Sequence, residues 1–257
     1  MTRVALVQLD VSDTEAVADR IDRAASIVES ITDADLIVLP ELWHVGAFDL
    51  AQAKAHAEPF DGPLVTRMRE AAATAKTTLH MGSFSELVGN DRHNTAVLID
   101  PTGDVLATYR KIHLFGWEEG EPSVMTAGRS CVVLPTPLGA TGLATCYDLR
   151  FPEMFRRLVD SGAESFLIDS GWPSPRINHW TVLAQARAIE NQAWVVACNS
   201  AGTHAGFEMG GSSIVVDPRG VVVAQAGVGE EILYADVDVE IAATWRRQFP
   251  VLADRVL

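Results

Sequence analysis

Three side chains suited to hydrolytic chemistry, Glu41, Lys111 and Cys146, each lie inside or at the end of an apolar stretch. A cysteine thiolate is a competent nucleophile, but a free cysteine is largely protonated near neutral pH and therefore needs a base. A carboxylate made more basic by burial can accept that proton. A buried ammonium can stabilise the oxyanion that forms at an attacked carbonyl. Together the three residue types indicate hydrolysis through a covalent thioester.

The sequence around Cys146 predicts a turn from a strand into a helix. Leu143 and Ala144 end a short apolar run that is typical of a buried strand. Residues 151–153, Phe-Pro-Glu, favour the start of a helix, because Pro suits the first turn and Glu complements the helix dipole. Open α/β sheets carry their chemistry at the carboxyl ends of strands, where this thiol is expected. The alternative is an inert buried cysteine, the usual fate of a free one.

Glu41 and Lys111 also have alternative interpretations. Glu41 follows a predicted strand at residues 36–39, and a carboxylate there is often simply exposed. Only three of the twenty basic residues are lysines, namely Lys54, Lys76 and Lys111. Lys111 has mostly apolar neighbours, so it is either a buried cation or a side chain that extends along apolar surface to reach water.

The three stretches resemble, in the same order, the three motifs of the nitrilase superfamily of carbon–nitrogen hydrolases. They are Leu39-Pro40-Glu41, Tyr109-Arg110-Lys111-Ile112-His113-Leu114-Phe115 and Cys146-Tyr147-Asp148-Leu149-Arg150-Phe151-Pro152-Glu153. The resemblance implies that Glu41 is the general base, Lys111 the oxyanion donor and Cys146 the nucleophile. It further implies that the backbone N–H of Tyr147 is a second oxyanion donor.

The resemblance also implies a fold and an assembly. The expected fold class is α/β, a four-layer αββα sandwich with two stacked mixed β-sheets, formed by a single domain over residues 1–257. Two Asp-Pro-x-Gly stretches, at residues 100–103 and 217–220, each lie between apolar strands and predict a type I turn in a β-hairpin. One hairpin per half of the chain suggests an internal pseudo-twofold. Assembly into a homodimer or higher homo-oligomer is implied by the resemblance alone.

Superfamily members carry a second glutamate downstream of the lysine, and residues 117–123 contain three candidates. We expect Glu121, because its spacing to Gly128 matches that of the branch this chain most resembles. Glu119 is the alternative, because aliphatic amidases place this glutamate nearer the lysine. Pro122 interrupts the usual Glu-Ser pairing and keeps both candidates open.

The residues after the cysteine bear on the substrate. True nitrilases have Trp-Glu there, whereas this chain has Tyr147-Asp148, like the amidase branch that includes ω-amidases and deaminated-glutathione amidases. Those substrates combine an amide with a carboxylate. Arg150 and Arg176 could bind that carboxylate, or form structural ion pairs, for example with Glu153 or Asp148.

The other expected substrate-binding residues are Tyr147, Trp172 in an irregular Gly- and Pro-rich loop, and Trp117. We therefore expect an amidase that releases ammonia from a small linear amide. One alternative is an N-carbamoyl amino acid hydrolase, which would use the same three residues on a ureido carbon. Another is a catalytically silent binding subunit, although the three residues are all present.

The composition limits the classes of partner and cofactor that are expected for this chain. The chain has 257 residues, is 48% hydrophobic with mean hydropathy +0.13, and carries a net charge of −14, with a pI of about 4.8. Such acidity argues against binding to nucleic acid or an anionic membrane surface. No metal-binding, Walker A or G-x-S-x-G motif occurs, so no metal or organic cofactor is expected.

Cysteine usage and the amino terminus bear on location. Three cysteines without a C-x-x-C pair suit a reducing cytoplasm. The apolar run at residues 4–9 is too short for a signal peptide or membrane span. Cys131 and Cys198 lie in strand-like runs and are expected in the core.

We also expect Asp13 or Thr14 to cap the first helix, and a helix over residues 179–191 to be buried all round.

Overall fold

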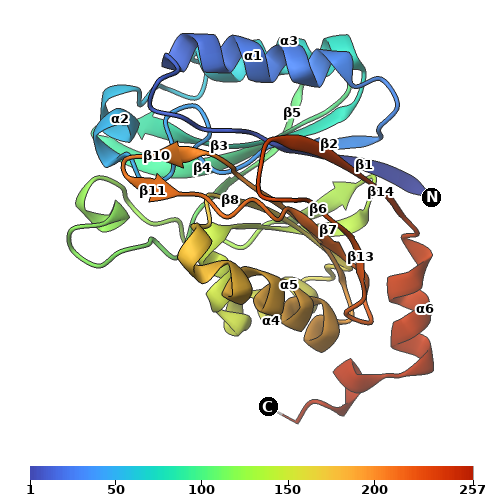
Figure 1. The fold of residues 1–257 in the computed structure, drawn as a ribbon. Coiled ribbons are helices and arrows are strands. Elements are labelled where there is room, and N and C mark those ends of the chain that lie inside the picture. The colour runs from blue at the N-terminus through green and yellow to red at the C-terminus, as the bar shows by residue number, and fades with distance from the viewer. Residues whose placement is uncertain (257) are drawn as a thin grey trace.

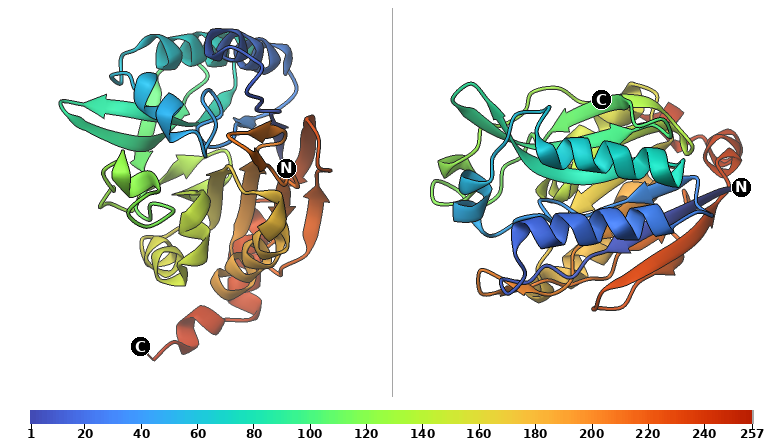
Figure 2. Two further views of the ribbon diagram at one scale, coloured as in Figure 1. Left: turned by 60° about the vertical axis from the view of Figure 1, so that its left-hand side comes forward. Right: turned by 90° about the horizontal axis from the view of Figure 1, so that it is seen from above.

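The computed structural model describes residues 1–256, in which two six-stranded mixed sheets stack between two outer layers of helices (Figures 1 and 2). In the first sheet the strand order is β14-β1-β2-β3-β4-β5. Its strands are β1 (Thr2–Gln8), β2 (Leu36–Val38), β3 (Thr78–Val88), β4 (Asp91–Ile99), β5 (Val105–Arg110) and β14 (Glu231–Val237). The helices α1 (Val17–Ser30) and α3 (Pro63–Ala75) cover its outer face (Figure 1).

The second sheet has the order β13-β12-β9-β8-β7-β6. Its strands are β6 (Val133–Thr136), β7 (Gly139–Thr145), β8 (Ser165–Ser170), β9 (Trp194–Asn199), β12 (Ile214–Val216) and β13 (Val222–Gln225). The helices α4 (Pro152–Asp160) and α5 (Ile177–Asn191) cover its outer face (Figure 1). The expected αββα sandwich is therefore confirmed, with parallel pairing in β1-β2-β3 and in β7-β8-β9.

Shorter elements complete the chain. They are α2 (Leu50–Ala55), the two-stranded ribbon β10 (Thr203–His204) and β11 (Phe207–Glu208), α6 (Glu240–Gln248), and 3₁₀ turns at Glu121–Ser123, Cys146–Arg150, Ser174–Arg176 and Val251–Asp254. None of the helices in the described part of the chain is long and apolar enough to cross a membrane.

Both predicted hairpins are present, one in each sheet. β4 and β5 pair across the first Asp-Pro-x-Gly turn, and β12 and β13 pair across the second. In each turn the Asp carboxylate accepts backbone N–H bonds, and Gly103 and Gly220 adopt φ of 87° and 86°. Glycine reaches this left-handed region without the steric cost a side chain would bring.

Three local expectations were wrong. The first helix begins after Ala16, which offers no side-chain cap, whereas the Asp13 carboxylate instead accepts the N–H of Ala205 in the β10–β11 ribbon. The helix α5 is buried on one side only, because Val182 and Ile189 on its other side are exposed. Cys131 precedes β6 and is only partly buried, whereas Cys198 lies in the core as expected.

Two strand ends bring the sheets into contact at the candidate site. Glu41 follows β2 of the first sheet, and its backbone N–H donates to the carbonyl of Ser170, at the end of β8 in the second sheet, at 3.3 Å. Cys146 follows β7, the neighbour of β8. The carboxyl ends of strands from both sheets therefore meet at one place, as the sheet geometry predicts.

Candidate active site

Cys146 lies in a strained turn between β7 and α4. Its φ is +45°, a left-handed value that is uncommon for a residue with a side chain. Such a conformation persists only where the surroundings enforce it, and here Thr145 and Asp148 form a capping box around the first turn. The predicted strand-to-helix turn is present, with a 3₁₀ segment between strand and helix.

Asp148 ties this turn to the segment that carries Lys111. Its fully buried carboxylate accepts the N–H of Thr145 at 3.0 Å and the hydroxyl of Tyr109 at 2.6 Å. It also contacts His113 twice, accepting the backbone N–H at 3.0 Å and lying 2.7 Å from the ring Nδ1. Asp148 is therefore a positioning residue and not the ion-pair partner considered for Arg150.

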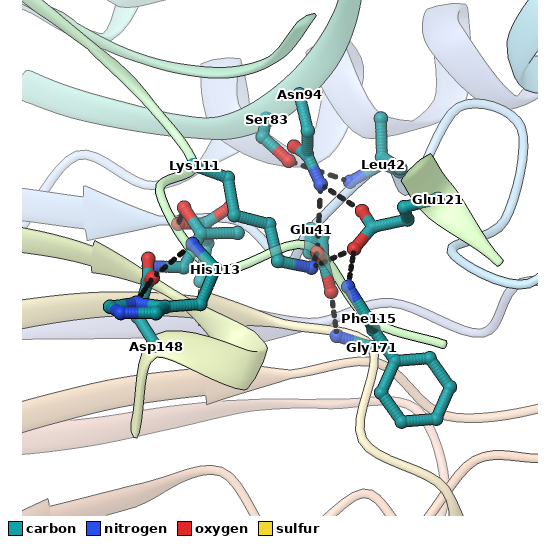
Figure 3. Close-up of polar contacts among 12 residues, drawn as sticks. Glu41, Leu42, Ser83, Asn94, Lys111, His113, Phe115, Glu121, Asp148 and Gly171 are labelled. Atoms are coloured by element: carbon teal, nitrogen blue, oxygen red, sulfur yellow. Dashed lines mark hydrogen bonds and ion pairs between the residues drawn. The ribbon is translucent and has the colours of Figure 1, made fainter. Parts of the chain in front are cut away.

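Lys111 lies between two carboxylates in the interior (Figure 3). Its Nζ donates to Glu41 Oε1 and to Glu121 Oε2, both at 2.7 Å. The exposed fractions of Lys111, Glu41 and Glu121 are 2%, 2% and 4%. The structure thus brings Glu121 to the lysine, whereas Glu119 is exposed.

Two backbone N–H groups fix the carboxylates. Gly171 N–H donates to Glu41 Oε2 at 2.9 Å, and Phe115 N–H donates to Glu121 Oε2 at 2.6 Å (Figure 3). Glu121 N–H returns a bond to the carbonyl of Phe115 at 2.8 Å, which closes the loop between them. Each carboxylate is therefore held from two directions.

Asn94 is a member of this cluster that sequence reasoning missed. Its amide Nδ2 donates to Glu41 Oε1 at 2.8 Å and to Glu121 Oε1 at 3.0 Å (Figure 3). Asn94 belongs to β4, and the pairing of strands within the first sheet brings it to residues 53 and 27 positions away. Its one sequence signal was its place in a predicted hairpin, which says nothing about chemistry.

The charges of the cluster set the resting protonation states. Burial alone would lower the pKa of Lys111, but Glu121 and Glu41 hold it well above its usual value, so Lys111 is an ammonium. Burial, followed by the charge of Glu41, raises the pKa of the Cys146 thiol well above its usual value, although Lys111 opposes this. The resting Cys146 side chain is therefore a neutral thiol, which must lose its proton before the sulfur could act as a nucleophile.

A small cavity of about 20 Å³ opens next to the thiol. It is lined by Phe48, Phe115, Cys146, Tyr147, Arg150, Gly171, Trp172, Pro173 and Arg176. Three of the four expected substrate-binding residues, Tyr147, Arg150 and Trp172, lie there. Trp117 does not line it, because its side chain is 92% exposed on the loop between Lys111 and Glu121.

Two guanidinium groups face this cavity over aromatic rings. Arg150 lies over Trp172 at 4.6 Å from the ring centroid, and Arg176 lies over Phe115 at 5.5 Å. Neither forms an ion pair with a carboxylate of the described chain. Burial lowers the pKa of Arg150, and the charge of Arg176 acts in the same direction. Two uncompensated cations beside a thiol favour an anionic group in the ligand.

Among residues 1–256, no group of three or more His, Cys, Asp or Glu side chains is arranged to hold a metal ion.

A sandwich of two mixed sheets with a thiol, a lysine and a glutamate at the facing strand ends defines a nitrilase-type hydrolase. Residues 3–247 match the carbon-nitrogen hydrolase family, and the chain belongs to that family.

Named relatives are similar over nearly the whole chain. The chain is 43% identical over 260 residues to the 2-oxoglutaramate amidase of Paenarthrobacter nicotinovorans. This alignment covers 98% of this chain and 88% of the relative. The crystal structure of Saccharomyces cerevisiae Nit3, a member of branch 10 of the nitrilase superfamily, has a TM-score of 0.89 at 31% identity, covering 100% and 97%. The amidase from Nesterenkonia sp. AN1 has a TM-score of 0.81 at 26% identity, covering 96% of each chain.

Proposed function

We propose that this protein is an ω-amidase that hydrolyses the terminal amide of a small carboxylate-bearing substrate of the 2-oxoglutaramate type to acid and ammonia. The observation that carries this proposal is the pair of guanidinium groups, Arg150 and Arg176, on the wall of the cavity that contains Cys146. It is supported by the names of two relatives, a 2-oxoglutaramate amidase at 43% identity and the omega-amidase NIT3 at 32%.

In the proposed acylation step, Glu41 takes the thiol proton while the Cys146 sulfur attacks the amide carbon. Lys111 has three N–H donors, of which two are bound by Glu41 and Glu121, so one remains for the oxyanion. The backbone N–H of Tyr147 supplies the second donor, at the first turn of a 3₁₀ segment, where such groups lack partners within the turn. Collapse of the tetrahedral intermediate breaks the C–N bond, and Glu41 gives its proton to the departing ammonia.

In the second step, Glu41 removes a proton from water, the hydroxide attacks the thioester, and the acid leaves as the thiol is re-formed. Glu121 is assigned no proton transfer and keeps its contact with Lys111, so the ammonium retains a carboxyl partner when Glu41 is neutral. A nucleophilic cysteine is supported by the Nesterenkonia relative, in which a glutamate-to-glutamine variant carries the acetamide moiety of fluoroacetamide on its active-site cysteine.

The substrate's carboxylate is assigned to Arg150 and Arg176. Stacking on Trp172 and Phe115 holds the two planar guanidinium groups before substrate arrives, which reduces the entropy lost on binding. The aromatic walls exclude water, which strengthens the pairing of a carboxylate with these cations.

We predict that Arg150→Gln lowers kcat/KM for a 2-oxo-ω-amide by about ten- to hundredfold, the scale of a hydrogen bond to a charged group. An uncharged amide such as butyramide should be affected much less. Ammonia release measures both, and Arg129→Gln, an exposed arginine outside the cavity, is the matched control. Equal losses on both substrates would contradict the carboxylate assignment.

The same panel tests the alternatives. N-carbamoyl amino acids would yield carbon dioxide together with ammonia, so carbon dioxide evolution would favour the carbamoyl hydrolase. Absence of turnover on amides and carbamoyl compounds alike would favour the silent binding subunit.

We predict that iodoacetamide alkylates Cys146 before either other cysteine. Only Cys146 has both Glu41 and Lys111 beside it and lines the cavity. Cys198 is fully buried, and Cys131 lies outside this cavity. Peptide mapping after brief labelling gives the order. Labelling of all three at one rate would count against Cys146 as the nucleophile.

The remaining expectations are also proposals. The free state of all three cysteines supports a cytoplasmic location. A homodimer or higher homo-oligomer rests on the family, and light scattering tests it. A single catalytic domain over residues 1–257 is supported by the family match at 3–247.

A further inference from the structure

A buried polar pair joins the two sheets beside the proposed active site. Asp169 lies near the end of β8 in the second sheet, and His80 lies in β3 of the first. Both side chains are fully buried. Asp169 Oδ1 is 4.0 Å from His80 Nε2, which is beyond hydrogen-bond distance. The proposed reaction uses neither residue, so the presence of two ionisable groups here requires another explanation.

The contacts of the pair indicate that both members are uncharged. His80 Nδ1 accepts the N–H of Gly82 at 3.2 Å, which leaves the ring proton on Nε2. Asp169 accepts the hydroxyl of Thr145 at 2.9 Å, while its Oδ2 has no partner among residues 1–256. An ionised carboxylate with so few donors and no cation would be costly in the interior.

Burial favours the uncharged forms of both His80 and Asp169, and the nearby charge of Glu41 also favours the uncharged form of Asp169. Burial lowers the pKa of His80 to about 4, so His80 does not supply a positive charge at neutral pH. Burial, followed by the charge of Glu41, raises the pKa of Asp169 to about 8. The titratable groups that face Asp169 are Glu41 at the end of β2, His80 in β3 and Cys198 in β9.

Asp169 is hydrogen-bonded to one strained turn of the site and lies near a residue that is hydrogen-bonded to the other. Thr145, its hydrogen-bond donor, immediately precedes Cys146. Ser83 lies next to Asp169, and its hydroxyl oxygen accepts the N–H of Leu42 at 3.1 Å (Figure 3). Leu42 immediately follows Glu41 and has φ of +42°, a left-handed value close to the +45° of Cys146.

We propose that Asp169 is a positioning residue for the reaction, which as a neutral acid fixes the turn of the nucleophile against the turn of the base. It acts through Thr145 on one side and Ser83 on the other. The proposal rests on the proposed function, because it assigns Glu41 and Cys146 their roles. Loss of the Asp169 proton would place a negative charge beside Glu41 and oppose thiolate formation at Cys146.

The proton can be tested without any substrate. Between about pH 4 and about pH 8 the folded protein would hold a proton on Asp169 that the unfolded chain releases. The contribution of this proton to the free energy of unfolding is complete below pH 4 and is lost as the pH rises to 8. The side chain that Asp169→Asn introduces does not titrate. The unfolding temperature of this variant, relative to that of the wild type, should therefore increase from pH 5 to pH 8. Asp217→Asn, in the β12–β13 turn, should show no such gain.

The positioning role is tested by kinetics. At pH 7, Asp169→Asn, which resembles the neutral acid, should keep most of kcat, whereas Asp169→Ala should lose about a hundredfold, with KM little changed. Above pH 8 the wild-type kcat should fall, and in Asp169→Asn this decline should move to higher pH. Thr145→Val should lose kcat like Asp169→Ala, and Thr145→Ser should recover it. This pair keeps the test available if Asp169→Ala does not fold.

Two results would overturn the proposal. One is a pH-independent difference in unfolding temperature between Asp169→Asn and the wild type. The other is an Asp169→Asn enzyme as slow as Asp169→Ala at pH 7. If the wild type hydrolyses no ω-amide, the proposed function fails separately. In that case the rate of Cys146 alkylation by iodoacetamide replaces kcat, with the same order expected among the variants.

Discussion

Cys146→Ala will abolish amide hydrolysis and leave the fold intact. The substitution removes the nucleophile, and loss of a nucleophile in a comparable hydrolytic triad costs about a millionfold in kcat. It introduces no buried polar group, and both side chains must adopt the same positive φ, so the backbone strain is unchanged. The measurement is ammonia release, with circular dichroism and unfolding temperature as checks on the fold.

Cys131→Ala is the matched control for this variant, because Cys131 is a partly buried free thiol outside the cavity. It should retain wild-type turnover. Turnover above about one per cent in Cys146→Ala would mean that another group attacks the carbonyl, since residual catalysis from oxyanion donors alone is far smaller.

The second large effect is expected for Glu41→Gln, which should lower kcat by about a thousandfold. General-base catalysis typically contributes about a hundred- to ten-thousandfold, and Glu41 is assigned this role in both half-reactions. Glutamine preserves the shape, but Glu41 Oε1 accepts from Lys111 and Asn94 while Oε2 accepts from Gly171. In either orientation of the amide, its NH₂ faces a donor, so some loss of geometry accompanies loss of the base.

Glu121→Gln separates these two causes. Glu121 has a comparable set of donors, from Lys111, Asn94 and Phe115, but is assigned no proton transfer. The limb of the kcat/KM pH profile that reports the base should disappear in Glu41→Gln and persist in Glu121→Gln. The opposite pattern would reverse the roles of the two glutamates.

The sequence predicted best what depends on neighbouring residues. The Asp-Pro-x-Gly turns and the Pro at the start of α4 follow from local backbone preferences, and the structure contains each. The contexts of Glu41, Lys111 and Cys146 were visible because each lies in or beside an apolar segment. The choice of Glu121 depended on a family spacing, and the structure brings that glutamate to Lys111.

Features that depend on distant contacts were not visible in the sequence. Asn94 reaches the cluster only when the strands of the first sheet pair, and Asp169 only when the two sheets stack. The capping prediction for Asp13 was wrong because its carboxylate binds Ala205, 192 residues later, and no local pattern reports that contact. Trp117 was expected to bind substrate, but its side chain is exposed to solvent.

The pairing of β1 with β14 has a consequence for synthesis of the chain. Seven residues of β1, Thr2 to Gln8, pair in register with Val237 to Glu231. On the ribosome, β1 therefore lacks one of its two neighbours until nearly the whole chain has emerged. Contacts so far apart in sequence are slow to form, and an apolar strand with an open edge can pair with other chains meanwhile. Yield in the cell should therefore depend on how well chaperones protect this edge during translation.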